Sequence, residues 1–158
     1  MAAWQPPLRE LCGGRAMLPD TLHNTLVFLG NVAEHRLEAL SLVAREAKFA
    51  DIELNLTGAH YWGHNHIVYA APEAIPPPLA DLVGDLGGRL RRHRFRLEDR
   101  AYKPHITLLR NAKWIDAPLP PMPSVRWRFR RFALVKSLSD EEGARYEVLA
   151  WFGAPELK

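Results

Sequence analysis

The order of apolar and polar residues predicts strands and helices in alternation along the chain. Residues 22–29 are mostly apolar and predict a strand that ends at Gly30. Ile52, Leu54 and Leu56 alternate with polar residues, which predicts a strand with one buried face. Residues 66–71 and 105–109 are two further predicted strands. The sequence therefore supplies several short strands, spread over the first two thirds of the chain.

Apolar residues recur at spacings of three and four in two other segments, which predicts amphipathic helices. The first starts at the capping-box-like pair Asn31 and Glu34, has its apolar residues within 37–47, and is expected to have about four turns. The second, residues 79–90, follows three prolines, and proline is well placed at the start of a helix. A shorter helix is expected before Gly13 and Gly14.

The last third of the chain predicts a sheet with one basic face. Val125, Trp127 and Phe129 alternate with arginines, so we expect the apolar side chains to be buried and the arginines exposed. The alternation shifts near residues 130–131, which predicts a β-bulge. A hairpin turn over residues 140–143 should lead into a final strand, 145–152. The pattern favours one α+β domain over residues 1–158.

Composition excludes several classes of protein. The chain has 158 residues, of which 47% are hydrophobic and 25% charged, close to the average for a globular domain. Cys12 is the single cysteine, so no disulfide framework can form, and a reducing compartment such as the cytoplasm is expected. The apolar runs are far shorter than a bilayer requires, so no membrane association is expected.

The formal charge of +3 is small, but the arginines are clustered. One cluster lies in residues 89–96 and another in residues 126–131. Such clusters either contact phosphate groups or form a solvated basic face.

A repeated pattern, His-x-Thr-apolar, carries the candidate chemistry. It occurs at His23 and Thr25 and again, half a chain later, at His105 and Thr107. Residues two apart in a strand point to the same face, so each histidine should share a face with its threonine. If the two strands face each other across a cleft, one imidazole can act as base and the other as acid in a displacement at phosphorus. The threonine hydroxyls can then stabilise charge on the phosphoryl oxygens, and the scheme needs no metal. The alternative is a pair of structural histidines.

The sequence segments around this pattern resemble those of a known family. Residues 22–30 (LHNTLVFLG) and 102–110 (YKPHITLLR) are similar to the two motifs of the two-histidine phosphoesterase superfamily. Within it they resemble the bacterial RNA 2′,3′-cyclic phosphodiesterases, historically called 2′-5′ RNA ligases. Ser137, Gly143 and Tyr146 resemble the closing hairpin of that family. The likeness covers roughly residues 4–152.

The resemblance implies a bilobal α+β fold, with two antiparallel sheets facing a central cleft, helices outside and a pseudo-two-fold. It implies hydrolysis of RNA 2′,3′-cyclic ends to 2′-phosphomonoesters, and reversible 2′-5′ joining of RNA ends. By the same resemblance His23 is the proton donor to the leaving oxygen, His105 is the proton acceptor from water, and Thr25 and Thr107 bind phosphate. The residues themselves do not say which histidine has which role. Arg110 lies beside the second motif and is expected either to bind phosphate or to form a structural ion pair. We expect no cofactor, no metal and no obligate protein partner.

The sequence departs from the family at two places. Asn24 stands where an apolar residue is more common, and it should point away from the catalytic face. Members of the family usually begin with an apolar strand and a longer first helix, whereas Met1 stands close to where that helix would already be under way. Either this strand is absent, or the natural start lies further upstream.

Other functions are open at this point. A module of the same fold could bind a nucleotide or an RNA end without turnover. His60, His64 and His66 could instead hold a zinc ion in a metal-dependent hydrolase. Tyr102, Trp127 and Phe129 are candidates either for stacking on bases or for the core.

Overall fold

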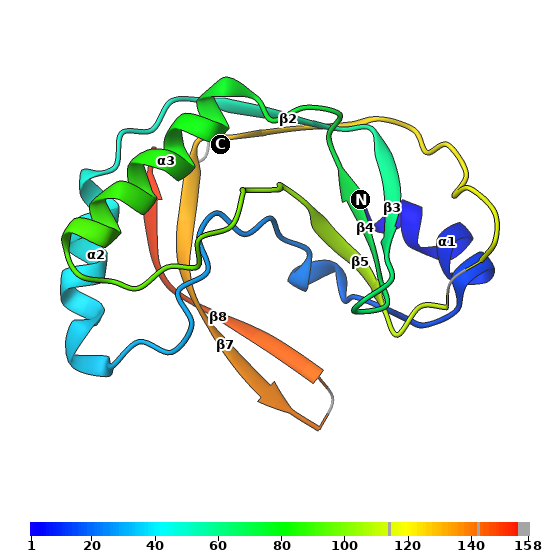
Figure 1. Ribbon diagram of the computed structural model, residues 1–158, viewed down its shortest axis with the longest axis horizontal. Coiled ribbons are helices and arrows are strands. Elements are labelled where there is room, and N and C mark those ends of the chain that lie inside the picture. Colours follow the sequence, from blue (N-terminus) through cyan, green and yellow to red (C-terminus); the bar gives the residue numbers. More distant parts are fainter. Residues whose placement is uncertain (114, 142, 155–158) are drawn as a thin grey trace. The chain divides into compact units, whose positions relative to one another are not determined.

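The computed structural model describes residues 1–113, 115–141 and 143–154. In it the chain forms two compact units. Unit 1 consists of Met1–Thr25, Leu54–Ile75 and Lys103–Trp127. Unit 2 consists of Leu26–Glu53, Pro76–Tyr102 and the described residues from Arg128 on. Each unit is therefore built from three separate parts of the sequence (Figure 1). That the two units form one two-lobed domain stays a prediction.

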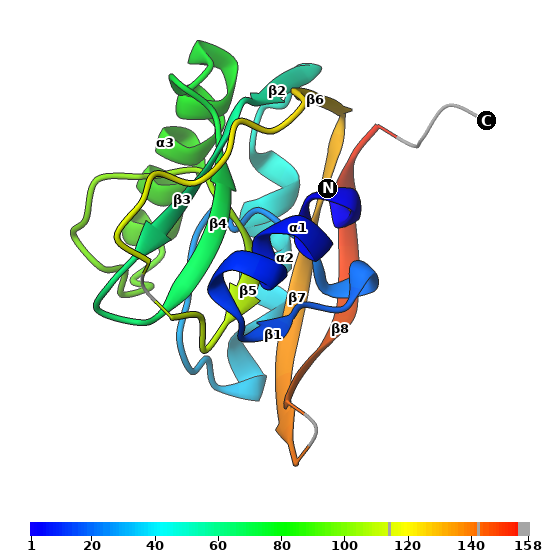
Figure 2. The same cartoon turned by 90° about the vertical axis from the view of Figure 1, so that its right-hand side faces the viewer.

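Unit 1 is a four-stranded antiparallel sheet with one helix. The strands lie in the order β1 (Arg15–Ala16), β5 (Ile106–Arg110), β4 (Ile67–Ala71) and β3 (Gly58–Trp62). Helix α1 (Gln5–Cys12) follows a 3₁₀ turn, η1 (Ala2–Trp4), and lies against the sheet near β1 and β5 (Figure 2).

The packing of α1 follows from its sequence. Trp4, Leu8 and Cys12 recur at every fourth position and are all buried, so they form one apolar face. Gln5 is buried beside them, and its side-chain amide donates hydrogen bonds to the Met17 and Leu108 carbonyl oxygens at 2.8 and 2.9 Å. A buried amide satisfied in this way fixes the helix against the sheet.

Unit 2 contains two helices and a long hairpin. Helix α2 (Leu37–Glu46) follows the turn η3 (Glu34–Arg36), and α3 (Pro77–Arg92) begins at the second of three prolines. Strands β7 (Arg131–Asp140) and β8 (Gly143–Gly153) form the hairpin, in which Ser137 lies opposite Tyr146. The core of the unit is made by Leu40, Val43, Leu90 and Phe95.

Strands β2 (Ile52–Leu56) and β6 (Val125–Phe129) pair with each other, and each has residues in both units. In β2 the apolar residues are buried and the polar ones exposed, which confirms the predicted alternation. In β6 the expected buried face is wrong, because Trp127 is 36% exposed and Val125 and Phe129 are only half-buried.

The α+β class and the antiparallel sheets are confirmed, as are the three helices and the final hairpin. Glu142, in the predicted hairpin turn, lies outside the described residues. Helix α2 is one turn shorter than its sequence pattern suggested. The predicted bulge at residues 130–131 is displaced, because the register of the hairpin shifts between Leu134 and Val135 instead. No helix among the described residues is long and apolar enough to cross a bilayer.

The predicted strand over residues 22–29 is wrong. The turn η2 (Pro19–Thr21) precedes this segment, and only Asn24 forms an isolated bridge to another strand. The reason is that the chain passes from unit 1 to unit 2 after Thr25. Val27 and Leu29 then pack against the core of unit 2, so their apolar side chains serve packing and the backbone has no continuous strand partner.

Candidate active site

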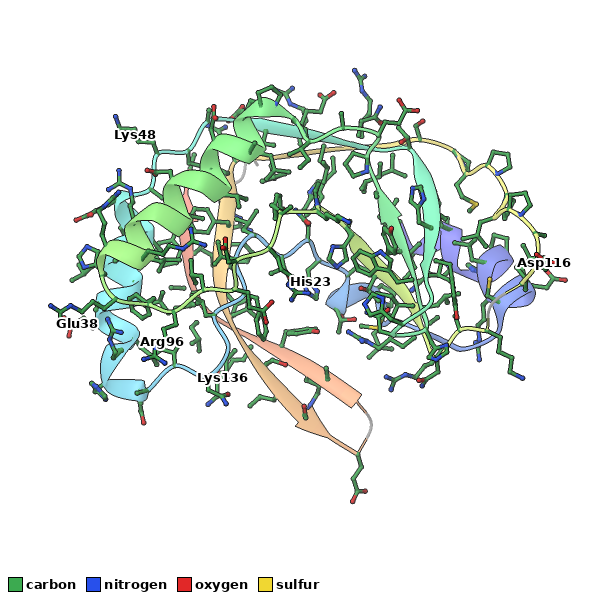
Figure 3. The ribbon with its side chains drawn as sticks, viewed as in Figure 1. His23, Glu38, Lys48, Arg96, Asp116 and Lys136 are labelled. Atoms are coloured by element: carbon green, nitrogen blue, oxygen red, sulfur yellow. The ribbon has the colours of Figure 1, made fainter. Side chains whose placement is uncertain are left out.

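The two His-x-Thr segments lie side by side in unit 1. Asn24 forms an antiparallel bridge to Ile106, and the Asn24 Oδ1 accepts a hydrogen bond from the His105 N–H at 3.1 Å. Figure 3 labels His23, which lies in the segment that follows η2. The segments therefore meet as neighbours, joined by a bridge, and not as two strands that face each other.

The antiparallel register around this bridge brings the four motif side chains to one face. Residues opposite each other in a ladder share a face, and their neighbours point the other way. Asn24 and Ile106 point inward, with Ile106 buried and Asn24 half-buried, while His23 and Thr25 are exposed. Continuing the register outward from the bridge puts His23 next to Thr107 and Thr25 next to His105. Each histidine is thus beside the threonine of the other motif.

Both imidazoles make the same local contact. The His23 Nδ1 lies 2.6 Å from the Thr21 carbonyl oxygen, and the His105 Nδ1 lies 2.8 Å from the Lys103 carbonyl oxygen. A carbonyl oxygen can only accept, so Nδ1 carries the hydrogen in both rings. The Nε2 atom of each ring is then an acceptor when the ring is neutral and a donor when it is charged. Both rings are thereby prepared for proton transfer at Nε2.

A β-bulge brings Arg110 to the same face. Tyr69 pairs with Thr107 and Val68 with Leu109, so Leu108 is the extra residue in β5. As a result Leu108 and Leu109 are both fully buried, whereas Thr107 and Arg110 are half-buried on the opposite face. Without the bulge, Arg110 would point into the core with Leu108.

Strand β1 fixes the backbone of Arg110 from the other side. Arg15 lies opposite Arg110 in the ladder. Gly14, with φ of 81°, precedes it, and a Cβ at Gly14 would lie 2.5 Å from the Arg110 carbonyl oxygen. The glycine is needed both for its positive φ and for this close approach.

Two aromatic residues that no sequence pattern connected with the site, Trp62 and Tyr69, lie beside His105. The ring centroids of Trp62 and His105 are 4.7 Å apart in an edge-to-face arrangement, and those of Tyr69 and His105 are 5.7 Å apart. Trp62 and Tyr69 also stack on each other at 4.2 Å. Burial raises the pKa of Tyr69, so its phenol is neutral at physiological pH. The alternation of β3 and β4 could have indicated this face, but nothing in the sequence linked it to His105.

The three histidines of the zinc alternative have separate contacts. His60 packs on Tyr69, His64 packs on Trp62, and the His66 Nδ1 lies 3.1 Å from the Tyr61 hydroxyl oxygen. In the part of the chain that the structure describes, no three His, Cys, Asp or Glu side chains group together as a metal site would require. Cys12 is buried, and burial raises the pKa of its thiol, so it is a poor nucleophile.

The stacking candidates belong to β6 and to the segment before His105. Trp127 and Phe129 belong to β6, and Phe129 packs against Phe49 with ring centroids 6.2 Å apart. Tyr102 belongs to unit 2. The arginines of residues 89–96 also belong to unit 2, whereas all five predicted site residues lie in unit 1.

This arrangement can perform acid–base chemistry at a phosphoryl group. Two imidazoles with oriented Nε2 atoms can remove one proton and supply another. Two hydroxyls and one guanidinium on the same face can bind the non-bridging oxygens and stabilise charge that develops there.

Comparison with known proteins agrees with this chemistry. The family model described as the 2′-5′ RNA ligase superfamily matches residues 2–141. The chain is 33% identical to the RNA 2′,3′-cyclic phosphodiesterase of Escherichia coli over 138 residues, which cover 86% of this chain and 77% of that protein. It is 31% identical to the Thermus thermophilus protein of the same name over 166 residues, covering 94% of this chain and 79% of that protein. The crystal structure of E. coli LigT with 3′-AMP matches with a TM-score of 0.82 at 28% identity, covering 99% of this chain and 94% of that one.

Proposed function

The chain belongs to the 2′-5′ RNA ligase superfamily, and from this premise we propose that it hydrolyses RNA 2′,3′-cyclic phosphodiester ends to 2′-phosphomonoesters. One observation carries the proposal above the others. The two His-x-Thr segments are joined in register by Asn24, and both histidines have Nδ1 bound to a backbone carbonyl. Structural histidines have no need of two identically prepared Nε2 atoms on one face.

The proposed reaction is an in-line displacement. The Nε2 of His105 takes a proton from water, and the water oxygen forms a bond to phosphorus. The bond between phosphorus and the 3′ oxygen breaks, and the protonated Nε2 of His23 gives its proton to that oxygen. The product carries a 2′-phosphate and a 3′-hydroxyl. The assignment of the two roles follows the family, since the two rings make the same local contact.

The other site residues act on the phosphoryl oxygens. Thr25 and Thr107 donate hydrogen bonds to the non-bridging oxygens, and the guanidinium of Arg110 balances the charge that builds up there. No step uses a metal ion. If a 5′-hydroxyl replaces water as the nucleophile, the same steps join two RNA ends by a 2′-5′ bond, and cleavage of that bond exchanges the roles of the histidines.

The substrate is then RNA, or a nucleotide, with a 2′,3′-cyclic phosphate. We place the activity in the cytoplasm, because the one cysteine, Cys12, is a free buried thiol that suits a reducing compartment. No cofactor or protein partner is part of the proposal.

The test is to incubate the protein with adenosine 2′,3′-cyclic phosphate, and separately with a short RNA that ends in this group, in excess EDTA. We expect turnover in both cases, with the 2′-monophosphate as product. A 3′-monophosphate would overturn the proposed bond cleavage. Tight nucleotide binding without product would support the non-catalytic binding module instead, and activity lost in EDTA would contradict metal independence.

A further inference from the structure

Unit 2 contains a cavity that the proposed reaction does not use. It has a volume of about 250 Å³ and is lined by three arginines, by Asn31 and by apolar residues. We call it the arginine pocket and define it by Arg36, Arg94, Arg96, Phe95, Leu29 and Val32. None of the described residues that line it is acidic. All of them belong to unit 2.

Arg36 is held rigidly in this pocket. Its guanidinium donates hydrogen bonds to the His93 carbonyl oxygen at 2.6 Å and to the Arg94 carbonyl oxygen at 3.2 Å. It also lies 3.9 Å above the ring of Phe95, which is buried. These contacts cap the end of α3, so Arg36 has a structural role. They also fix a positive charge in place, so no side-chain entropy is lost when an anion binds to it.

Arg94 occupies a backbone position where glycine is usual. Its φ is 63°, in the left-handed region. The Arg94 N–H donates to the Arg91 carbonyl and the Phe95 N–H to the Leu90 carbonyl, which is the hydrogen-bond pattern of a Schellman helix end. A side chain is disfavoured there. An arginine kept in strained backbone at the edge of a cavity indicates that its side chain has a use.

The charges of Arg94 and Arg96 are not compensated. Arg89, in the same stretch, is paired with Asp85 at 3.0 Å and with Glu46 at 3.4 Å. By contrast, no ion pair among the described residues involves Arg94 or Arg96, and both are exposed. Figure 3 labels Arg96 on the segment after α3 and Glu38 on α2. The pocket thus concentrates positive charge in a protein whose formal charge is only +3.

We propose that the arginine pocket binds a backbone phosphate of single-stranded RNA, at a phosphate other than the one that reacts. This inference rests on the proposed function for the identity of the anion as RNA. Arginine suits a phosphate because its planar donors match two phosphate oxygens. An open pocket with several guanidiniums suits a polyanion, since each contact releases counterions from the strand. The protein then binds an oligonucleotide more tightly than a mononucleotide.

Direct binding tests the proposal without turnover. The probe is a fluorescently labelled oligouridylate of about twelve nucleotides with a 3′-hydroxyl, measured by anisotropy at several KCl concentrations. For Arg94→Gly with Arg96→Gln we expect Kd to rise on the order of tenfold at 0.1 M salt, and the salt slope to fall by about 1.4, which is two single-strand contacts. The control, Arg45→Gln with Lys136→Gln, removes two exposed charges from α2 and β7 of the same unit and should change neither. An equal loss in the control, or no loss in the pocket variant, overturns the proposal.

Thermal unfolding separates binding from folding. Arg94→Gly places glycine at the left-handed helix end, so we expect its Tm to rise while RNA binding weakens. A rise in Tm with unchanged RNA affinity would show that Arg94 has no role in binding.

Kinetics distinguishes this proposal from the proposed function. In Arg94→Gly with Arg96→Gln, we expect the KM for an RNA with a 2′,3′-cyclic end to rise relative to the KM for adenosine 2′,3′-cyclic phosphate. An unchanged ratio contradicts the arginine pocket. Failure of the unmodified protein to hydrolyse the mononucleotide contradicts the proposed function, while the anisotropy result still decides the pocket.

Discussion

The two His-x-Thr segments have the same sequence pattern and different backbones. His105 precedes β5 directly, and Thr107 lies within this strand of the four-stranded sheet. His23 and Thr25 lie in a segment whose one bridge is made by Asn24. Yet both histidines bind a carbonyl two residues back in the chain. The hydrogen bond that orients each imidazole is therefore a local property of the motif, and it forms whether or not the motif lies in a strand.

The surroundings of the two rings also differ. The His105 ring is packed against Trp62 and Tyr69, and the backbone N–H of His105 donates a hydrogen bond to the Asn24 side chain. His23 is exposed. One segment is thus built into a sheet, and the other meets it at the Asn24 bridge, where the Asn24 side chain also accepts a hydrogen bond from the His105 backbone N–H. The comparison predicts that the first segment depends on the second for its position.

Substitution of the two threonines tests whether the two segments contribute equally to the chemistry although their backbones differ. Thr25→Val and Thr107→Val each remove one hydroxyl donor while keeping the shape of the side chain. We expect each to lower kcat roughly 10²-fold, the usual effect of losing one such donor. Thr57→Val, in the same unit, is the control and should be close to wild type. If only Thr107→Val has an effect, the segments are not equivalent.

Asn24 tests whether the first segment is held by the second. Asn24→Leu keeps the size of the side chain and the apolar character common in the family, but removes the acceptor of the His105 N–H. We expect kcat to fall roughly tenfold, the value of one hydrogen bond, with little change in KM. Asn55→Leu on β2, an exposed position, is the matched control. A higher KM with an unchanged kcat would contradict a positioning role for Asn24.

Trp62 tests whether the packing of His105 matters. Trp62→Leu removes the edge-to-face contact with His105, whereas Trp62→Phe keeps an aromatic ring there. We expect kcat to fall about threefold to tenfold in the leucine variant, with the phenylalanine variant restoring most of it, since such ring contacts are worth about 1 kcal/mol. Trp151→Leu, at an exposed tryptophan of unit 2, provides the control. Equal rates for all three variants would mean that the ring contact does not position His105.

Substitution of Asp85, which lies on α3 in unit 2, tests whether the catalytic site is confined to unit 1. Burial alone would raise the pKa of Asp85, but hydrogen bonds from Arg89 and from the Lys48 N–H, with the charges of Arg89 and Arg92, hold it below its ordinary value of 3.8. A carboxylate with a lowered folded pKa stabilises the fold above the unfolded pKa, and this stability is lost as pH falls through the folded value.

We therefore expect Asp85→Asn to lower Tm by about 2–4 °C at pH 7, equivalent to about 1 kcal/mol. The difference should shrink as pH falls below 3.8 and vanish only once the pH is below the lowered folded pKa of Asp85, where the parent protein is protonated at this carboxyl. Asp81→Asn, exposed on the same helix, should not change Tm. Turnover of the mononucleotide below Tm should be unchanged, and a clear loss would contradict the confinement of the site to unit 1.

The sequence was sufficient where local pattern decides structure. The alternation of β2, the apolar face of α3 and the hairpin near residue 140 depend on neighbours in the chain. The His-x-Thr pattern occurs twice, which is rare by chance, and this repetition alone indicates the four motif residues. Their placement on one face agrees with the alternation expected for extended chain.

The parts that the sequence could not supply depend on distant residues. Residues 22–29 have the composition of a strand, but their pairing is confined to the Asn24 bridge, and Val27 and Leu29 pack against the core of unit 2 instead. The face of Arg110 is set by the bulge at Leu108, which only the pairing with β4 reveals. Trp62 reaches His105 because β3, β4 and β5 are neighbours in one sheet. The role of Asn24 depends on its hydrogen bond with the backbone N–H of His105, 81 residues away, which no local pattern indicates.

The central claim is that His23 and His105 act together as acid and base. Single-turnover rates on adenosine 2′,3′-cyclic phosphate for His23→Ala, His105→Ala and the double variant test it most directly, with His35→Ala as an exposed control. We predict that each single variant loses on the order of 10²–10⁴ in rate, and that the double variant loses little more than the worse single one. A wild-type rate in either single variant would contradict the account.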